Sequence, residues 1–178
     1  MNIINNTCVE VLPALLNKTK NSTIRKAWST EHDGDCFNAP YNYWDVPKPA
    51  KYKVGDVCEM IWDEKSEYTI FAKSIGKGIF KQKVEYNTDL FFHKNLGKIE
   101  IIEVYKIKIH KLIIDDDING LKESYAIENY SQKEDLFDGK IIAKKDGFES
   151  AHAMFKYLDD IYDLSTPKEF WVYEYRWL

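Results

Sequence analysis

Residues 99–114 read IEIIEVYKIKIHKLII, and this stretch decides the fold class. β-branched residues dominate it, and apolar and charged side chains alternate along much of it, as in a strand that lays one face on a core. The same strand signals occur upstream at Val57–Trp62, Tyr68–Ile75 and Gly78–Val84, with Gly76-Lys77-Gly78 as a hairpin turn. The middle of the chain is therefore predicted to be a β-meander.

Helical and further strand patterns flank this meander. Helices are predicted at Val9–Leu16, weakly at Leu121–Tyr130, at Leu136–Lys145 with a stop at Asp146-Gly147, and at Ser150–Tyr162. Ser22–Arg25 and Glu169–Leu178 alternate as strands do, and we expect these strands from the two ends of the chain to pair. The order predicts an α+β fold in which a small curled sheet or β-barrel is flanked by helices.

Residues 26–51 show neither a helical nor a strand period. Acidic, glycine and proline residues alternate there with five aromatic residues, which are Trp28, Phe37, Tyr41, Tyr43 and Trp44. A loop of this length is uncommon in a compact domain unless it is functional or disordered, and the aromatic residues favour an ordered one. We therefore expect a long functional loop at this place.

Length, composition and charge narrow the class of protein. A chain of 178 residues with 44% hydrophobic and 30% charged residues is typical of one globular domain. The net charge of −4 divides unevenly, because residues 1–114 hold 17 Lys and Arg against 14 Asp and Glu, while residues 115–178 hold 8 against 15. Non-specific binding along nucleic acid, which needs a strongly basic domain, is therefore disfavoured. A local basic site remains open.

Cysteine usage and hydropathy indicate the compartment. The three cysteines, Cys8, Cys36 and Cys58, are an odd number at wide spacing, which fits a reducing, cytoplasmic location rather than a disulfide framework. The apolar run Val9–Leu16 is interrupted by Glu10 and Pro13, so we expect no signal peptide, membrane span or membrane partner.

Metal and cofactor chemistry receive little support. His32, Asp33, Asp35 and Cys36 crowd together, but their spacing matches no recurrent zinc pattern, and a turn is the simpler interpretation. Gly76-Lys77-Gly78 is too short to cradle a phosphate, and the sequence holds no nucleophile elbow. We therefore expect no metal and no cofactor, and a P-loop hydrolase is excluded.

The most suggestive stretch is residues 18–26, KTKNSTIRK, which holds four positive charges and no acid. On a strand, Thr23 and Arg25 share one face, and the long stem of Lys20 can fold back toward them. Such a corner is suited to an anion or a nucleobase. The alternative is a solvated basic edge, and the pattern alone does not choose between the two.

Four stretches, in this order, resemble the landmarks of the ASCH domain, a branch of the PUA-like β-barrels. They are Lys20-Asn21-Ser22-Thr23-Ile24-Arg25, Tyr52-Lys53-Val54-Gly55-Asp56-Val57, Ala143-Lys144-Lys145-Asp146-Gly147-Phe148 and Phe170-Trp171-Val172-Tyr173-Glu174-Tyr175. The resemblance implies one domain over residues 1–178, a small β-barrel with a cleft beside the Thr-Ile-Arg strand. It also implies a ligand of the kind that the family binds, RNA or a modified nucleoside. The loop 26–51 and a hairpin region at 65–96 are enlarged in this chain.

Within that family the chain looks most similar to the small bacterial amidohydrolases that deacetylate acetylated cytidine. The resemblance implies a catalytic Lys20, Thr23 and Asp146, with Thr23 as nucleophile and Lys20 as base. Asp146 stands where those enzymes have a glutamate, so the acid is one methylene shorter. For nucleotide binding we expect Arg25, Lys26, Trp28 and Tyr43, with Arg25 meeting a phosphate or stabilising developing negative charge and Trp28 or Tyr43 stacking on a base.

Three functions remain as alternatives. Binding of RNA or a modified nucleoside or nucleotide comes first, because a cleft can hold a base with an aspartate at position 146. Removal of an acyl group from a modified nucleoside comes second, because catalysis depends on the reach of that carboxylate. The third is an adaptor that binds another protein through the acidic residues 115–178.

Overall fold

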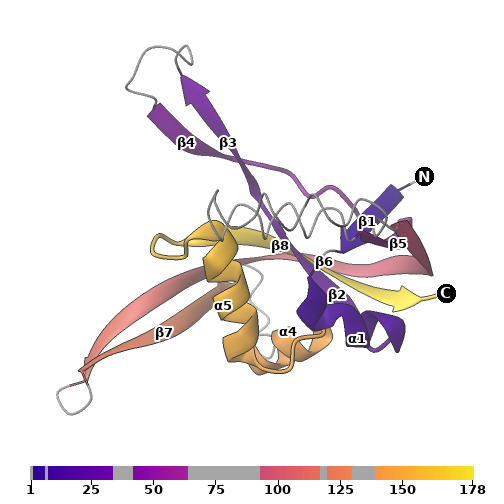
Figure 1. The fold of residues 1–178 in the computed structure, drawn as a ribbon. Coiled ribbons are helices and arrows are strands. Elements are labelled where there is room, and N and C mark those ends of the chain that lie inside the picture. The colour runs from indigo at the N-terminus through magenta and orange to yellow at the C-terminus, as the bar shows by residue number, and fades with distance from the viewer. Residues whose placement is uncertain (1, 7, 34–41, 64–92, 117–119, 130–138) are drawn as a thin grey trace, which may run out of the picture.

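A computed structural model describes residues 2–6, 8–33, 42–63, 93–116, 120–129 and 139–178 (Figure 1). The strands are β1 (Asn2–Asn6), β2 (Ser22–Lys26), β3 (Trp28–Asp33), β4 (Asn42–Pro47), β5 (Val57–Asp63), β6 (His93–Asp116), β7 (Gly120–Asn129) and β8 (Lys168–Trp177). The helices are a short 3-10 turn (Val9–Val11), α1 (Leu12–Leu16), α4 (Gly139–Lys145) and α5 (Ala151–Tyr162).

The main sheet has the order β1-β5-β6-β8-β2, with β7 added to β6. β1 lies parallel to β5, and the other ladders are antiparallel. β2 pairs with β8 from Ser22 opposite Glu174 to Lys26 opposite Phe170, which confirms the expected pairing of strands from the two ends of the chain. The sheet curls into a half-barrel with helices beside it, so the predicted α+β class is confirmed.

The long strand β6 organises this sheet. Its 24 residues contain the stretch 99–114 that the sequence singled out. The first part pairs with β5, the middle with β8 and the last part with β7, so that three strands share one partner. The β6–β7 ribbon reaches well past α5 in Figure 1, and the Ile113 side chain near its far end is exposed.

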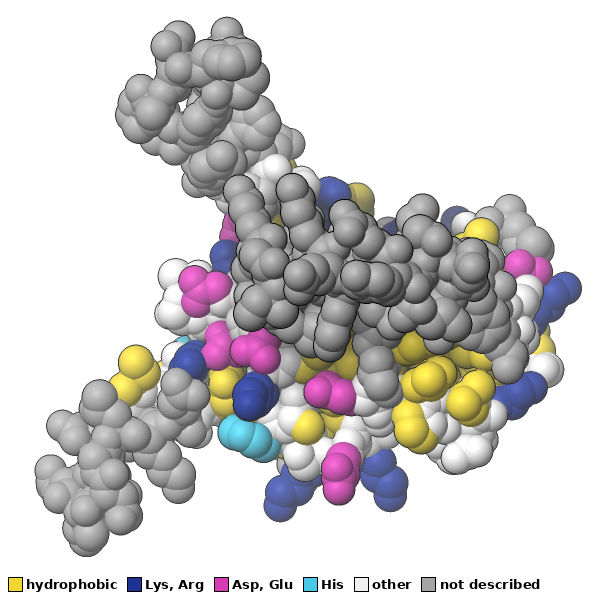
Figure 2. Space-filling view, viewed as in Figure 1, with side chains coloured by type: hydrophobic (Ala, Val, Ile, Leu, Met, Phe, Trp, Pro, Cys, Tyr) yellow, Lys and Arg dark blue, Asp and Glu magenta, His cyan; other side chains and the backbone are white. Residues whose placement is uncertain are grey.

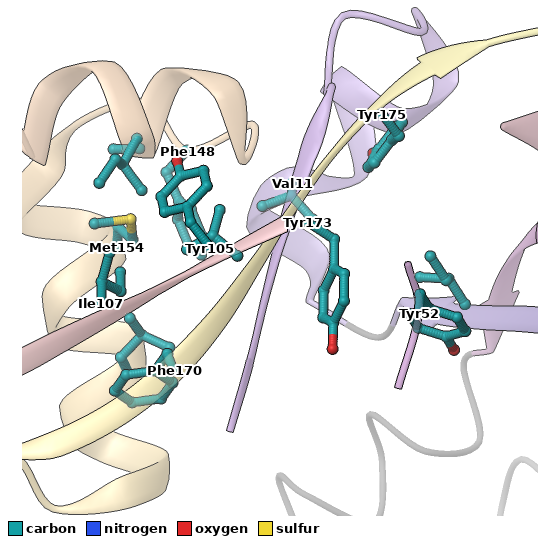
Figure 3. Packing of buried hydrophobic residues seen from close by; sticks show 14 of the residues in the cluster. Val11, Tyr52, Tyr105, Ile107, Phe148, Met154, Phe170, Tyr173 and Tyr175 are labelled. Carbon is teal, nitrogen blue, oxygen red and sulfur yellow. The ribbon is translucent and has the colours of Figure 1, made fainter. Parts of the chain in front are cut away.

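The core lies between the sheet and the helices α4 and α5. Met154 of α5 is buried against the sheet near Ile107 and Phe170 (Figure 3), and Leu158 of α5 belongs to the same core. α5 begins at Ser150, whose side chain accepts a hydrogen bond from the Ala153 N–H at 3.1 Å. The predicted helices at Val9–Leu16, Leu136–Lys145 and Ser150–Tyr162 are thus present, although α4 begins only at Gly139 in the described residues.

Two expectations about local structure were wrong, and one strand was not expected. Residues 120–129 form strand β7 rather than a helix, because pairing with β6 overrides the helix propensity of this stretch. Residues 28–33 and 42–47 form a two-stranded sheet, β3–β4, rather than a loop. The strand β1 was not expected at all, since three of its five residues are asparagine.

Some expected features fall outside the described residues. They include the strands Tyr68–Ile75 and Gly78–Val84, most of the hairpin region 65–96, and Asp35 and Cys36, which the sequence analysis interpreted as part of a turn. In the part of the chain that the structure describes, no group of three or more His, Cys, Asp or Glu is placed to hold a metal ion.

None of the described helices has both the length and the apolar character that crossing a membrane requires.

Candidate functional site between the two edge strands

Two pockets adjoin each other between β1 and β2, the edge strands of the curled sheet, and we call this space the seam. The inner pocket has a volume of about 60 Å³ and is lined by Asn6, Cys8, Lys20, Thr23, Arg25 and Asp146, among others. The outer pocket has a volume of about 320 Å³. Arg25 lines both pockets, and its guanidinium donates to the backbone carbonyl of Asn5 in β1. One arginine therefore bridges the two sheet edges.

A buried ion pair forms one wall of the inner pocket. Lys20 is only 2% exposed, and its Nζ contacts the carboxylate of Asp146, which is 6% exposed. The same Nζ lies 2.5 Å from the backbone carbonyl oxygen of Asp146. The backbone N–H of Ile24, in the edge strand β2, also donates to the Asp146 carboxylate. The aspartate therefore reaches Lys20 even though it is one methylene shorter than a glutamate.

The local backbone explains how Asp146 reaches Lys20. Asp146 continues from the end of α4, and Gly147 then turns the chain with a φ of +88°. The backbone of residues 20 and 21 is fixed from two sides, because Trp177 Nε1 donates to the Lys20 carbonyl and Asn21 N–H donates to the Lys145 carbonyl, both at 2.9 Å. The end of α4 is thereby held directly against the segment before β2.

Burial sets the electrostatics of this pair. Desolvation lowers the pKa of Lys20 below its usual 10.5, although the Asp146 carboxylate acts in the opposite direction. Desolvation likewise raises the pKa of Asp146 above its usual 3.8, against the opposing effect of the Lys20 ammonium. The neutral amine of Lys20 is therefore more accessible than that of a surface lysine, which is what a general base requires.

Thr23 supplies a hydroxyl to the same pocket. It is 3% exposed, lies in β2 opposite Tyr173, and lines the inner pocket together with Lys20 and Asp146. Cys8 also lines the inner pocket and carries a potentially nucleophilic thiol, but burial and the nearby charge of Glu10 raise the pKa of this thiol to about 12. Thr23 is thus the better nucleophile candidate of the two.

Only some of the expected nucleotide-binding residues line the outer pocket. Arg25 and Lys26 line the outer pocket. Trp28 does not, because its ring is 8% exposed and packs edge-on against Tyr162 and Phe170 at centroid distances of 5.5 and 5.3 Å. The expectation that Trp28 stacks on a base is therefore corrected. Tyr43 belongs to β4, and its side chain lies outside the described part of the structure.

Sequence reasoning missed several residues of the outer pocket. Trp171 and Tyr173 of β8 line it, together with Lys48, Lys51 and Tyr52 from the segment before β5. Tyr52 and Tyr173 lie next to each other (Figure 3), and their ring centroids are 5.2 Å apart. In the sequence, the alternation of the terminal strand could have indicated Trp171 and Tyr173, because both lie on one face of that strand. In the structure they lie opposite Arg25 and Thr23 of β2. No local pattern marked Lys48 or Lys51.

The acidic residues of the last third of the chain do not form one continuous patch on the face that carries α4 and α5. Among the described residues on that face, acidic and basic side chains are interspersed (Figure 2). Several acids of residues 115–178 have basic partners, such as Asp159 with Lys111 at 3.1 Å and Glu174 with Lys145 at 2.8 Å. This face therefore offers no strong argument for an adaptor that binds through negative charge.

Comparisons with protein-family models, with curated proteins and with solved structures found no match for this chain. The resemblance to the ASCH domain thus rests on the four stretches of sequence that carry it.

Proposed function

We propose that the protein is an ASCH-type module, on a PUA-like fold, that binds a modified nucleoside or nucleotide in the seam. One observation carries the proposal: Lys20, Thr23 and Asp146, from distant parts of the chain, line one inner pocket that adjoins an aromatic and basic outer pocket. The ligand is either free or a nucleotide within RNA.

The dimensions of the two pockets suggest how such a ligand is divided. An outer pocket of about 320 Å³ lies at the small end of the range for ligand pockets, which suits a single nucleoside-sized molecule. The inner pocket, at about 60 Å³, has room for about two water molecules. A small substituent on the base fits this volume, whereas the base itself does not. The base therefore belongs in the outer pocket, with its modification directed toward Lys20 and Thr23.

Aromatic side chains of the outer pocket support a flat ligand. Trp171 is half-buried, and its Nε1 donates to the Lys48 carbonyl at 2.9 Å, which fixes the orientation of the ring. Stacking of a base on an aromatic side chain contributes about 1–3 kcal/mol. A ring held in this way binds without a large loss of side-chain entropy.

The binding test is calorimetry with a panel of modified nucleosides and nucleotides, including acetylated cytidine. We expect Trp171→Ala to weaken binding about tenfold or more, the loss that corresponds to one base stack. Trp44→Ala is the matched control, because Trp44 is an exposed tryptophan of β4 that does not line either pocket. Absence of binding to every member of the panel at low salt would contradict the proposal.

Hydrolysis of an acyl group is the second candidate, and the buried Lys20–Asp146 pair beside Thr23 is the observation that favours it. Thr23 Oγ would attack the amide carbonyl of an acylated base while its proton passes to the Lys20 amine. Collapse of the tetrahedral intermediate would break the C–N bond, and Lys20 would return the proton to the leaving amine. Water would then hydrolyse the acyl-threonine ester. Asp146 would orient Lys20 throughout.

Thr23→Val tests this chemistry, because valine keeps the shape of the buried side chain and removes only the hydroxyl. We expect release of acetate from acetylated cytidine to fall to the uncatalysed rate while ligand binding is retained. The rate of the unaltered protein should rise with pH and reach its plateau below the usual lysine pKa of 10.5, because the pKa of Lys20 is lowered. Equal loss of turnover and binding in Thr23→Val would exclude a nucleophilic role.

A further inference from the structure

We propose that the outer pocket contains a phosphate subsite formed by Lys26, Lys48 and Lys51 beside Arg25. The ligand of the seam is then a nucleotide, free or within RNA, rather than an unphosphorylated nucleoside. This inference rests on the proposed function for the identity of the base, and it adds a phosphate group to the ligand.

The charge of the outer pocket carries the inference. Four cationic side chains line it, and no acidic residue is among its lining residues. Arg25 and Lys26 come from the edge strand β2, whereas Lys48 and Lys51 come from the segment that precedes β5. Like charges that converge on one pocket repel one another, and a phosphate dianion relieves this repulsion.

Other lysines among the described residues have acidic partners, unlike the four cations of the outer pocket. Lys106 in β6 and Lys168 in β8 form ion pairs with Glu169 and Asp45 at 3.0 and 2.6 Å. Within the part of the chain that the structure describes, no such carboxylate partner occurs for Arg25, Lys26, Lys48 or Lys51. Arg25 donates to the Asn5 carbonyl, and Lys51 Nζ lies 5.0 Å from the centroid of the Tyr52 ring, but neither contact neutralises a positive charge.

The segment that carries Lys48 and Lys51 is held in place by side chains of the main sheet. Trp171 Nε1 donates to the Lys48 carbonyl, and the Lys51 N–H donates to the Tyr173 hydroxyl, both at 2.9 Å. The next residue, Tyr52, is buried, and its hydroxyl donates to the Ile3 carbonyl of β1 at 2.5 Å. Binding an anion therefore requires only the ordering of lysine side chains on a fixed backbone, which limits the entropic cost.

The same arrangement orients the nucleotide. Arg25 lies where the two pockets adjoin, and Trp171 is its register partner in β8. A base that stacks near Trp171 with its modification toward the inner pocket leaves its phosphate for the three lysines. Without a phosphate, the ligand would leave these charges uncompensated.

The experiment compares ligands that differ only in the phosphate. Calorimetry is performed with acetylated cytidine and with its 5′-monophosphate, and inorganic pyrophosphate is titrated alone as a probe of the subsite. We expect the monophosphate to bind at least tenfold more tightly than the nucleoside at low salt. In Lys48→Gln/Lys51→Gln this difference should fall below about threefold, and pyrophosphate binding should be lost. The matched control is Lys53→Gln/Lys98→Gln, which removes two exposed lysines that do not line either pocket.

The outcomes separate this inference from the proposed function. Equal affinity for nucleoside and monophosphate, unaffected by the double variant, overturns the phosphate subsite and leaves nucleoside binding standing. Pyrophosphate binding that only Lys48→Gln/Lys51→Gln removes, without binding of either cytidine ligand, supports the subsite and counts against the acetylated base. Failure of pyrophosphate and of both cytidine ligands overturns the subsite and the acetylated base together.

A short single-stranded RNA distinguishes the two sources of the phosphate. If the ligand is a nucleotide within RNA, a hexanucleotide that contains acetylated cytidine should bind more tightly than the monophosphate. Its affinity should also fall more steeply with salt, because more phosphates are neutralised. If the ligand is a free nucleotide, the hexanucleotide should bind no better than the monophosphate. Either result supports the subsite, provided that Lys48→Gln/Lys51→Gln weakens the binding.

Discussion

Gly147 places the acid of the candidate site. Its φ of +88° lies in the left-handed region, and a Cβ at this position would lie 2.9 Å from the Cβ of Ala14 and 3.4 Å from that of Lys20. A glycine is thus required at this position for two reasons, which are its backbone conformation and the close approach of α1. Gly147 directly follows Asp146, so the turn that packs against α1 also holds Asp146 beside Lys20.

We predict that Gly147→Ala destabilises the protein by about 2 kcal/mol or more and weakens ligand binding, because strain and a steric clash add. Gly55→Ala is the matched control, since Gly55 has a similar φ of +89° but nothing within 4 Å of an added Cβ. It should cost only the backbone strain, about 1 kcal/mol. Urea denaturation of both variants gives the comparison, and equal losses would show that the close approach has no effect.

The buried charge of Lys20 affects stability as well as chemistry. Removing one member of a buried ion pair leaves the other charge without compensation, which costs about 3–5 kcal/mol. An exposed pair contributes far less, because water and salt screen it. Arg176 and Glu100 form such a pair at 2.6 Å, with the arginine side chain 65% exposed.

We therefore predict that Lys20→Met lowers the free energy of unfolding by about 3 kcal/mol or more, whereas Arg176→Met lowers it by less than about 1 kcal/mol. The double variant Lys20→Met/Asp146→Leu should recover much of the loss, because no unpaired charge remains. Denaturation in urea near pH 7 measures all three. A loss in the double variant as large as that in Lys20→Met would mean that the shape of this site, not its charge, determines the effect.

At the scale of elements, Asp159 connects α5 to the β6–β7 ribbon. Its carboxylate accepts from the Leu164 N–H at 2.8 Å, from the Tyr125 hydroxyl at 3.2 Å and from Lys111 Nζ at 3.1 Å. Burial alone would raise the pKa of Asp159, but these donors outweigh burial and lower it below 3.8. The carboxylate therefore stabilises the fold at neutral pH.

The sign of the pH dependence follows from this shift. Because the folded pKa of Asp159 is lower than the unfolded one, the unfolded chain binds more protons between the two values, and stability rises with pH there. Asp159→Asn should thus cost about 1–2 kcal/mol at pH 7, and this difference should vanish as the pH falls through the folded pKa. Asp160→Asn, its exposed neighbour, should change stability by less than about 0.5 kcal/mol. A cost for Asp159→Asn that is independent of pH would exclude the charge as its source.

At the scale of the whole molecule, β3 and β4 stand apart from the main sheet. They pair only with each other in the described residues and extend away from the half-barrel in Figure 1. Trp28 anchors the base of this hairpin in the core, and Lys168 pairs with Asp45 at 2.6 Å. A two-stranded hairpin with few other contacts is only marginally stable in water.

Hydrogen exchange should therefore divide the molecule into two regions. We expect the amides of β6 and β8, at the centre of the sheet, to exchange only by global unfolding, whereas those of β3 and β4 should exchange by local opening several orders of magnitude faster. Exchange followed by mass spectrometry resolves the two segments. Protection of the hairpin to the level of β8 would show that it belongs to the same cooperative unit.

The sequence by itself determined the elements whose pattern is strong and local. Alternation in residues 99–114 and in the terminal strand, and helical spacing in residues 150–162, placed β6, β8 and α5, because those periods reflect which face is buried. The basic string around Thr23 and the resemblance to a known family identified Lys20, Thr23 and Asp146 as a set.

Only the tertiary structure decided the rest. β7 and β1 form because a partner strand supplies their hydrogen bonds, and no local propensity encodes a partner. Curling of the sheet brings β1 near β2, and this approach creates the seam. Lys48 and Lys51 join Arg25 at the outer pocket, and Trp28 enters the core instead, because long-range packing determines which side chains converge.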